Sequence, residues 1–345
     1  MDKVTTPEQS VMPKNPVIIV HALAGDLLMM SPTLRFFARH VGETVRLICG
    51  VEKNTQDLLR QIGFKRLVAT TFSVEEIVTD EHGERTYWTC ETGPVRAALE
   101  GADLVINLLE FTGDSLASVT ARSAVPSLGF HEAATHRLAF DFQNDHLIDS
   151  YFQFAHHFSP DAVAANYMVF PHRPDGAQIR QRLAERLGTD DYIVIHTDTK
   201  PQKMWPLANW KNLLGRLWET EPDLKILLVG YPFIPLEKIS PDPRLIDCRD
   251  IPLTVSYEVV AGARLFIGID SSMLHAADFC RVPTVAIFAS RYPTKRYGIK
   301  FAISRTLVGA NPPDDIEISS VFQCVLEVVA AAGVPIRLSS SAVAA

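Results

Sequence analysis

Short, mostly apolar runs of β-forming residues, five to seven residues long, recur along the first half of the chain, and stretches of helical length separate them. They lie at 17–22, 45–50, 66–72, 103–108 and 126–130. A strand covered on one face alternates apolar and polar residues, whereas a strand buried on both faces of a parallel sheet is apolar throughout. This half is therefore predicted to be a doubly wound α/β domain.

A second series of such runs follows. Its members lie at 192–197, 225–230, 244–248, 265–270 and 284–289. Between the two series, two prolines and a glycine in "MVFPHRPDGAQ" (168–178) interrupt any regular pattern. We therefore expect two doubly wound domains, at 1–170 and 181–345, joined by a linker at 171–180, with the last helix able to pack back on the first domain.

Helical periodicity supports this division. After the first run, Leu34, Phe37, Ala38 and Val41 share one helical face, with Ser31 and Pro32 as the expected cap and first-turn residues. In the second half, Pro206 is expected to open a helix with one apolar stripe. The stripe consists of Trp210, Leu213, Leu214, Leu217 and Trp218, which we expect to be core residues.

Composition limits the class of protein. The 345 residues are 47% hydrophobic and 21% charged, which is typical of a globular chain. No run approaches the roughly 18 apolar residues of a membrane span, and the polar start "MDKVTTPEQSVMPKNP" has no secretory apolar core. The expected location is the cytoplasm. The five cysteines (Cys49, Cys90, Cys248, Cys280 and Cys324) form no C-x-x-C pair and are expected to be buried thiols.

Charge is unevenly distributed. Residues 1–150 carry 13 Lys and Arg against 20 Asp and Glu, whereas the remainder carries 20 of each, so all of the net charge of -7 lies in the first half. Recognition of nucleic acid requires a basic face. We therefore expect no nucleic-acid partner.

The first candidate site follows the first apolar run, in "HALAGD" (21–26). Gly25 permits an unusual backbone conformation or a close approach. Asp26 then stands at the start of a helix. It is either an N-cap, favoured by the helix dipole, or a carboxylate presented for chemistry.

Two further candidate sites lie at expected strand ends in the second half. In "HTDTKPQKMWP" (196–206), Thr197, Thr199 and Lys203 could bind phosphates, although a solvated loop would have a similar composition. In "FIGIDSSMLHAADF" (266–279), Asp270 is expected to cap a helix whose first turn, with the hydroxyls of Ser271 and Ser272, would bind an anion. His275, one turn into that helix, is either a phosphate donor or a structural residue.

Some classes of site are disfavoured. No G-x-G-x-x-G follows the first run and no G-x-x-x-x-G-K-[ST] occurs, which disfavours nicotinamide dehydrogenases and P-loop enzymes. The pair His156-His157 has no carboxylate or cysteine nearby at metal-ligand spacing, so no metal is assigned to it.

Taken together and in this order, the three stretches resemble glycosyltransferase family 9, the bacterial ADP-heptose heptosyltransferases of lipopolysaccharide core assembly. "HALAGDLLMMSPTLRFF" is similar to the family's opening pattern, "DLVINL" to its mid-domain strand and "HTDTKPQKMWPLANW" to its Lys-x-Trp-Pro loop. "IGIDSSMLHAADFCRVPTVAIFA" is similar to its Asp-Ser/Thr-Gly-x-x-His helix start. The resemblance spans about residues 17–290.

This resemblance implies a GT-B fold of two facing Rossmann-like domains, the N-terminal one binding the acceptor and the C-terminal one the nucleotide sugar. It implies an inverting transfer of heptose or a related sugar from an ADP-linked or other nucleoside-diphosphate donor to a hydroxyl acceptor, with no metal and no cofactor. The acceptor would be a glycan, lipid-linked or small, and the protein would be cytoplasmic, with peripheral contact at the inner membrane.

The resemblance also implies roles for individual residues. Asp26 matches the general base, and Lys203 matches the lysine that neutralises the leaving diphosphate. Asp270, Ser271, Ser272 and His275 match the diphosphate-binding helix start, and Glu237 corresponds loosely to a glutamate that holds a ribose hydroxyl.

The chain departs from the family pattern in two places on the donor side. Ser272 replaces a glycine, and Ala289-Ser290-Arg291, within "ASRYP", replaces Gly-Pro-Thr. These departures leave two alternatives open, a non-catalytic homologue that binds nucleotide or protein and a sugar-nucleotide epimerase of the same architecture. The acidic N-terminal half also leaves open a neutral or small acceptor in place of an anionic lipid.

Overall fold

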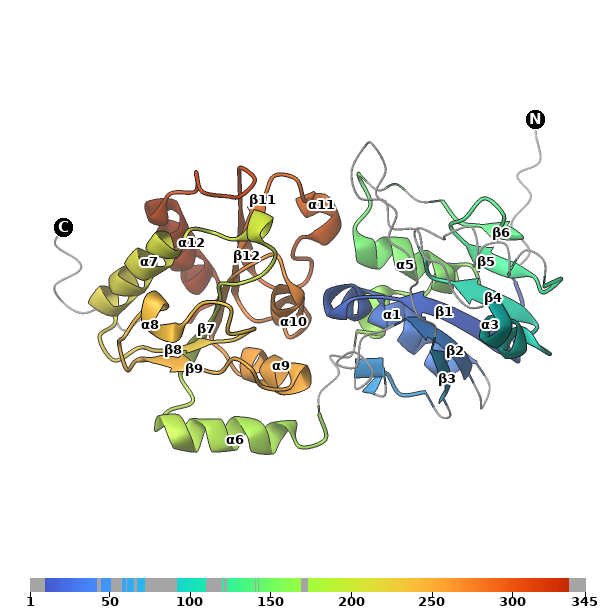
Figure 1. The fold of residues 1–345 in the computed structure, drawn as a ribbon, viewed down its shortest axis with the longest axis horizontal. Coiled ribbons are helices and arrows are strands. Elements are labelled where there is room, and N and C mark those ends of the chain that lie inside the picture. Colours follow the sequence, from blue (N-terminus) through green and yellow to red (C-terminus); the bar gives the residue numbers. More distant parts are fainter. Residues whose placement is uncertain are drawn as a thin grey trace. The chain divides into compact units, whose positions relative to one another are not determined.

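The protein is described from a computed structural model that covers residues 10–41, 45–50, 58–59, 61–64, 67–71, 92–109, 120, 123–139, 141, 143–168 and 173–334. The chain divides into two compact units, Met1–Val169 and Phe170–Ala345 (Figure 1). Each unit is described by itself below.

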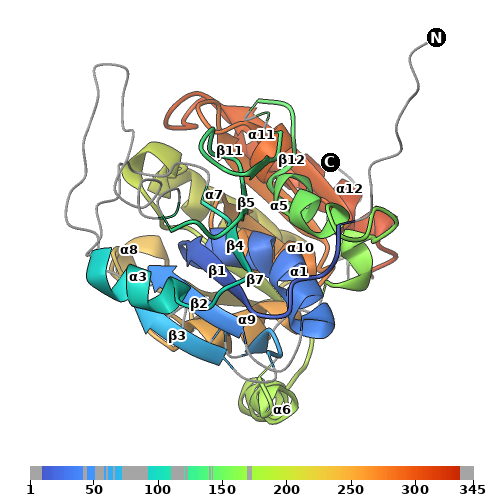
Figure 2. The ribbon, with the colours of Figure 1, turned by 90° about the vertical axis from the view of Figure 1, so that its right-hand side faces the viewer.

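The N-terminal unit is built on a parallel sheet, in which six strands are described. They are β1 (Pro16–His21), β2 (Val45–Gly50), β3 (Leu67–Thr71), β4 (Leu104–Asn107), β5 (Ser127–Gly129) and β6 (His136–Arg137). Their order is β3-β2-β1-β4-β5-β6, with every neighbouring pair parallel (Figure 1). Figure 2 shows β3, β2, β1, β4 and β5 from another side. The direction of growth reverses between β1 and β4. In open α/β sheets, ligands bind beyond the carboxyl ends of the strands at such a switch point.

The described helices of this unit are α1 (Ala24–His40), α3 (Thr92–Leu99), α5 (Leu147–His156) and the 3₁₀ turn η1 (Ala164–Asn166). Helix α1 packs against α5. The expectation that Ser31 and Pro32 open this helix is wrong, because α1 begins seven residues earlier, at Ala24. Pro32 removes one backbone hydrogen bond from the interior of the helix. The helix continues through Pro32 because nearly all the residues around it, from Leu27 to Leu34, are buried and tertiary packing supplies most helical stability.

The C-terminal unit repeats the plan. Its described strands are β7 (Tyr192–His196), β8 (Lys225–Leu228), β9 (Leu245–Asp247), β10 (Leu265–Ile269), β11 (Thr284–Ala289) and β12 (Ser304–Gly309). The order β12-β11-β10-β7-β8-β9 is again parallel throughout and places the switch point between β7 and β10.

Helices cover both faces of this second sheet (Figure 1). They are α6 (Gly176–Leu187), α7 (Leu207–Thr220), α8 (Leu236–Ile239), α9 (Leu253–Ala261), α10 (Ser272–Phe279), α11 (Thr294–Tyr297) and α12 (Ile318–Ala331), with the 3₁₀ turn η2 at Pro201–Lys203. Helix α12 packs on α7, β11 and β12 of its own unit, and α9 packs on α10 and α6. The predicted stripe of α7 is buried in full, and Pro206 is the N-cap of that helix.

A buried glutamate on α9 holds the first residues of the C-terminal unit and helix α6 in place. Glu258 on α9 is 0% exposed. Its carboxylate accepts a hydrogen bond of 2.8 Å from the backbone N–H of Arg173 and forms an ion pair with Arg180 on α6. Gly176 lies so close to this carboxylate that an added Cβ would clash with it. Helix α6 therefore occupies the second half of the segment 171–180 that was expected to be a linker.

The ten predicted strands are confirmed to within two residues at either end, whereas β6 and β12 were missed. Both are edge strands. The two residues of β6 are exposed, and β12 exposes Arg305, Thr306 and Val308. A search for continuous apolar runs finds strands buried on both faces, so it passes over edges of this kind.

Two expectations from composition can be compared with the structure. Cys49 is buried, but Cys248, Cys280 and Cys324 are free thiols of intermediate exposure, and Cys90 lies outside the described residues. Of the described helices, none combines the length and the apolar character needed to cross a bilayer.

Candidate functional site

In the N-terminal unit, Gly25 and Asp26 follow β1 at the switch point of the sheet and lie in the first turn of α1. Both are half-buried. The N-cap is Leu23, which has an extended backbone and no capping side chain, so the N-cap interpretation of Asp26 is wrong. A carboxylate in the first turn is still favoured by the helix dipole. Asp26 is therefore a first-turn residue at the edge where open α/β sheets bind ligands.

In the C-terminal unit, the switch point brings Lys203 and Asp270 together. Lys203 ends the η2 turn after β7, and Asp270 follows β10, the neighbouring strand. The Lys203 ammonium donates to the Asp270 carboxylate, and the two side chains are only 17% and 6% exposed. Two residues 67 positions apart thus form an ion pair at the edge where an α/β sheet binds its ligand.

Helix α10 starts at this edge, and its cap differs from the expectation. The N-cap is Ser271, whose hydroxyl accepts a hydrogen bond of 3.4 Å from the Leu274 N–H, whereas Asp270 was expected to cap the helix. Asp270 instead accepts from Lys203. Ser272 is the first helical residue and is half-buried, and His275 is 4% exposed. The first turn of α10 supplies backbone N–H donors suited to an anion.

At the end of β7, residues 196–198 are buried, whereas the two residues that follow are more exposed. Thr197 is 1% exposed, and its hydroxyl has no hydrogen-bond partner among the described residues, whereas Thr199 is half-buried. Burial lowers the pKa of His196 to about 4 and raises the pKa of Asp198 to about 6, the latter against the attraction of Arg249. At neutral pH, the His196 ring is therefore uncharged.

Asp198 and His196 pack against the chain after β8. Gly230 has a φ of +121°, and an added Cβ would lie 2.9 Å from both Asp198 Oδ1 and His196 Nε2. A side chain at position 230 would therefore be strained and would displace both residues. This glycine allows the β8 loop to close over the end of β7.

Glu237 lies on α8, beyond β8, and is exposed. Its charge raises the pKa of Arg249, although less than Asp247 does. The Arg249 guanidinium binds both carboxylate oxygens of Asp247, at 2.8 and 2.7 Å, and donates to the Ile234 carbonyl oxygen at 2.6 Å. Glu237 thus belongs to the Arg249 cluster at the ends of β8 and β9, whereas Lys203, Asp270 and Ser271 gather around β7 and β10.

Sequence reasoning missed three residues at this edge. Asp198 stands between the two threonines that were chosen, Arg249 carried no motif, and Tyr292 lies in the loop "ASRYP", which was noted only as a departure. The ring centre of Tyr292 is 4.0 Å from Lys203 Nζ. The departure itself was the signal that could have directed attention to Tyr292.

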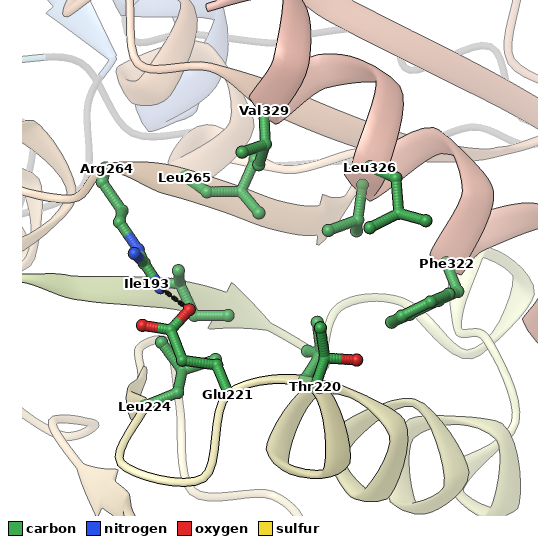
Figure 3. A pocket seen from close by; sticks show the side chains of 11 residues that line it. Ile193, Thr220, Glu221, Leu224, Arg264, Leu265, Phe322, Leu326 and Val329 are labelled. Atoms are coloured by element: carbon green, nitrogen blue, oxygen red, sulfur yellow. Dashed lines mark hydrogen bonds and ion pairs between the residues drawn. The ribbon is translucent and has the colours of Figure 1, made fainter. Parts of the chain in front are cut away.

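A separate small cavity lies at the opposite edge of the sheet. Ile193 and Leu265, near the amino ends of β7 and β10, line it together with residues of α7 and α12 (Figure 3). The ion pair of Arg264 with Glu221 lies at one side. Its volume is about 30 Å³, room for about one water molecule, so it cannot hold a nucleotide. Within the described ranges, no cluster of three His, Cys, Asp or Glu side chains is placed to bind a metal.

Two doubly wound parallel sheets of matching strand order define the GT-B class of fold. The sequence profile of glycosyltransferase family 9 (heptosyltransferase) matches residues 130–324, more than half of the chain. The chain belongs to that family.

Solved structures agree on the fold. The glycosyl transferase family 9 structure from Veillonella parvula DSM 2008 has a TM-score of 0.70 at 16% sequence identity, and the match covers 92% of this chain and 97% of that one. E. coli heptosyltransferase WaaC with ADP has a TM-score of 0.63 at 15% identity, covering 91% and 99%. UDP-GlcNAc 2-epimerase from Methanocaldococcus jannaschii has a TM-score of 0.55 at 12% identity, covering 90% and 92%. A search of curated protein sequences finds no match.

Proposed function

We propose that the protein is an inverting glycosyltransferase that moves heptose or a related sugar from a nucleoside-diphosphate donor, with ADP as the first candidate, to a hydroxyl of a glycan. The observation that carries the proposal is the Lys203–Asp270 pair at the switch point of the C-terminal sheet, in a chain of glycosyltransferase family 9. The structure of WaaC with ADP supports testing ADP first.

In the proposed reaction, the Asp26 carboxylate takes the proton of the acceptor hydroxyl, and the acceptor oxygen attacks the anomeric carbon. The bond from that carbon to the diphosphate oxygen breaks, and its electron pair leaves with the nucleoside diphosphate. A positioned base contributes about 10²- to 10⁴-fold to such a rate. Attack opposite the leaving group inverts the anomeric centre.

The leaving diphosphate gains negative charge, and this protein offers fixed positive charge and dipoles for it. Lys203 supplies the ammonium, held by Asp270, and the first turn of α10 supplies backbone N–H groups. Preorganised groups of this kind are usually the largest electrostatic contribution to catalysis. We propose that they suffice without a metal, and that Thr199 contacts the phosphates more readily than the buried Thr197.

The acceptor side rests on the N-terminal unit. Residues 1–150 have a net charge of -7, which repels an anionic acceptor unless basic groups are concentrated locally. We propose a glycan acceptor of low charge, either small or lipid-linked, for a protein that acts in the cytoplasm and can touch the inner membrane.

The test is calorimetric titration with ADP, GDP, UDP and CDP, in EDTA, of the wild type and two variants. Lys203→Ala should weaken binding of the preferred diphosphate at least tenfold, whereas Lys200→Ala, an exposed lysine three residues earlier, should change it little. No binding of any diphosphate by the wild type, with or without added Mg²⁺, would overturn the donor assignment.

Transfer is tested separately, by mass spectrometry of acceptor glycans incubated with ADP-heptose. Asp26→Asn should abolish the glycosylated product and leave diphosphate binding nearly unchanged. Full turnover by this variant would remove Asp26 from the mechanism. A change in the donor without any adduct would indicate epimerisation, and binding without either reaction would indicate a non-catalytic homologue.

A further inference from the structure

The Lys203 ammonium contacts two groups that come from different strand ends. One is the Asp270 carboxylate, after β10. The other is the ring of Tyr292, after β11, with its ring centre 4.0 Å from Nζ. This distance is well within the range of a cation–π interaction. The surroundings of Lys203 therefore include a residue that no family motif assigned.

Backbone hydrogen bonds hold the loop that carries Tyr292. The Tyr292 N–H donates to the Ala289 carbonyl oxygen at 3.0 Å and closes a turn, and the Ser290 N–H donates to Gly309 of β12 at 2.8 Å. Pro293 then caps α11. The loop is thus tied to the sheet on one side and to a helix on the other, which holds the backbone of Tyr292 in place.

Lysine needs such a restraint. Its side chain is long, and the freedom it loses when it is ordered is among the largest of any residue. The ammonium has three N–H donors. Asp270 accepts one of them, and the Tyr292 ring lies against the ammonium. In the proposed function, a phosphate oxygen accepts another.

We infer that Tyr292 is a positioning residue that holds the Lys203 ammonium beside Asp270, ready for the diphosphate of the donor. This inference rests on the proposed function of Lys203. Tyr292 acts through the face of its ring, so the role requires an aromatic residue at position 292 and does not require the hydroxyl. The altered loop "ASRYP" is then a working part of the donor site.

The first experiment is a double-mutant cycle in diphosphate binding, measured by calorimetry with whichever of the four nucleotides the wild type binds. Tyr292→Leu, which keeps bulk and removes the ring, should weaken binding about three- to tenfold. Tyr292→Phe should stay within about twofold of the wild type. In a Lys203→Met background, Tyr292→Leu should cause no further loss.

An equal loss from Tyr292→Leu in both backgrounds would overturn the inference, because the ring would then act independently of Lys203. Unchanged binding by Tyr292→Leu would overturn it as well. The tryptophan fluorescence of each variant shows whether it is folded, and Tyr292→Met takes the place of Tyr292→Leu if the latter does not fold.

A second measurement needs no nucleotide and so separates the inference from the proposed function. Lysines are acetylated briefly with acetic anhydride, and mass spectrometry gives the labelling of Lys203 relative to the exposed Lys238. Tyr292→Leu should raise that ratio severalfold, and Tyr292→Phe should not. Failure of the wild type to bind any diphosphate would defeat the proposed function alone, whereas an unchanged labelling ratio would defeat the role of Tyr292.

Discussion

Replacing Asp198 by asparagine should stabilise the C-terminal unit more at pH 8 than at pH 5. The Asp198 side chain is buried, and burial raises its pKa from 3.8 to about 6, although Arg249 acts in the opposite direction. Between these two values the folded protein binds more protons than the unfolded chain. The free energy of unfolding of the wild type therefore falls as the pH rises through this window.

The magnitude follows from the two pKa values. At 1.36 kcal/mol per pKa unit, the buried ionised carboxylate costs about 3 kcal/mol above pH 7. At pH 5 most of the folded protein is protonated at Asp198, which leaves about 1.4 kcal/mol of change between pH 5 and pH 8. Asparagine has nearly the same shape and no charge, so the variant should lack this pH dependence.

The assay is urea unfolding followed by tryptophan fluorescence. Three of the four tryptophans, Trp205, Trp210 and Trp218, lie in the core of the C-terminal unit, so the signal reports mainly on that unit. The stability difference between variant and wild type should grow by about 1.4 kcal/mol from pH 5 to pH 8. The same difference at both pH values would refute the buried-carboxylate reasoning.

Asp247→Asn is the matched control. Arg249 holds the pKa of Asp247 below its ordinary value through a side-chain hydrogen bond. A carboxyl group whose pKa is lowered in the folded protein stabilises it at every pH above the pKa of that group in the unfolded chain. This stability is lost only as the pH falls through the acidic range. The control variant should therefore be less stable than the wild type, by nearly equal amounts at pH 5 and pH 8.

Three further predictions concern stability. Glu258→Gln should lower the free energy of unfolding of the C-terminal unit by about 2–3 kcal/mol. This is a small loss for a buried ion pair, because Arg180 remains a third exposed. Urea unfolding measures it, and a change below about 0.5 kcal/mol would show that the pair is dispensable. Val329→Ile should add about 0.5–1 kcal/mol by filling the 30 Å³ cavity, and a lower thermal midpoint would show that the cavity has no room. Trp205→Phe should lower the free energy of unfolding by about 1–3 kcal/mol beyond the loss of packing, since it leaves the buried Ile316 carbonyl without its 3.0 Å donor. Denaturant titration measures this loss, with Trp210→Phe as the control for lost packing.

The fold was predictable because buried strands and buried helix faces have strong local patterns. The run at 192–197 and the stripe from Trp210 to Trp218 could be found by eye, since residues 192–195 and every residue of the stripe are apolar and buried. The start of α1 could not be found this way. Pro32 is a typical first-turn residue, and only the burial of the preceding turn, a tertiary effect, keeps the helix intact through it.

The sequence predicted which strand ends carry the candidate site, but it could not predict which side chains contact one another there. Lys203 and Asp270 were both chosen, yet their ion pair depends on β7 and β10 being neighbours, and that follows from the strand order. Asp198 was passed over because nothing in "HTDTK" shows which of its side chains points inward. Tyr292 was missed because a single aromatic residue in a loop has no periodic pattern.

The two units repeat one strand order, and each has a hydrophobic core of its own, which affects how the sequence of such a protein can change in evolution. Among the described residues, the core cluster around Trp205, Trp210 and Val325 belongs to the C-terminal unit, and the cluster around Val17, Ile48 and Val105 belongs to the N-terminal one. Since additivity holds for residues that share no partners, mutations that retune one hydrophobic core leave the other unaffected. If the N-terminal unit binds the acceptor and the C-terminal unit the donor, as proposed above, the two specificities can evolve separately, and chimaeras joined near residue 170 should exchange them.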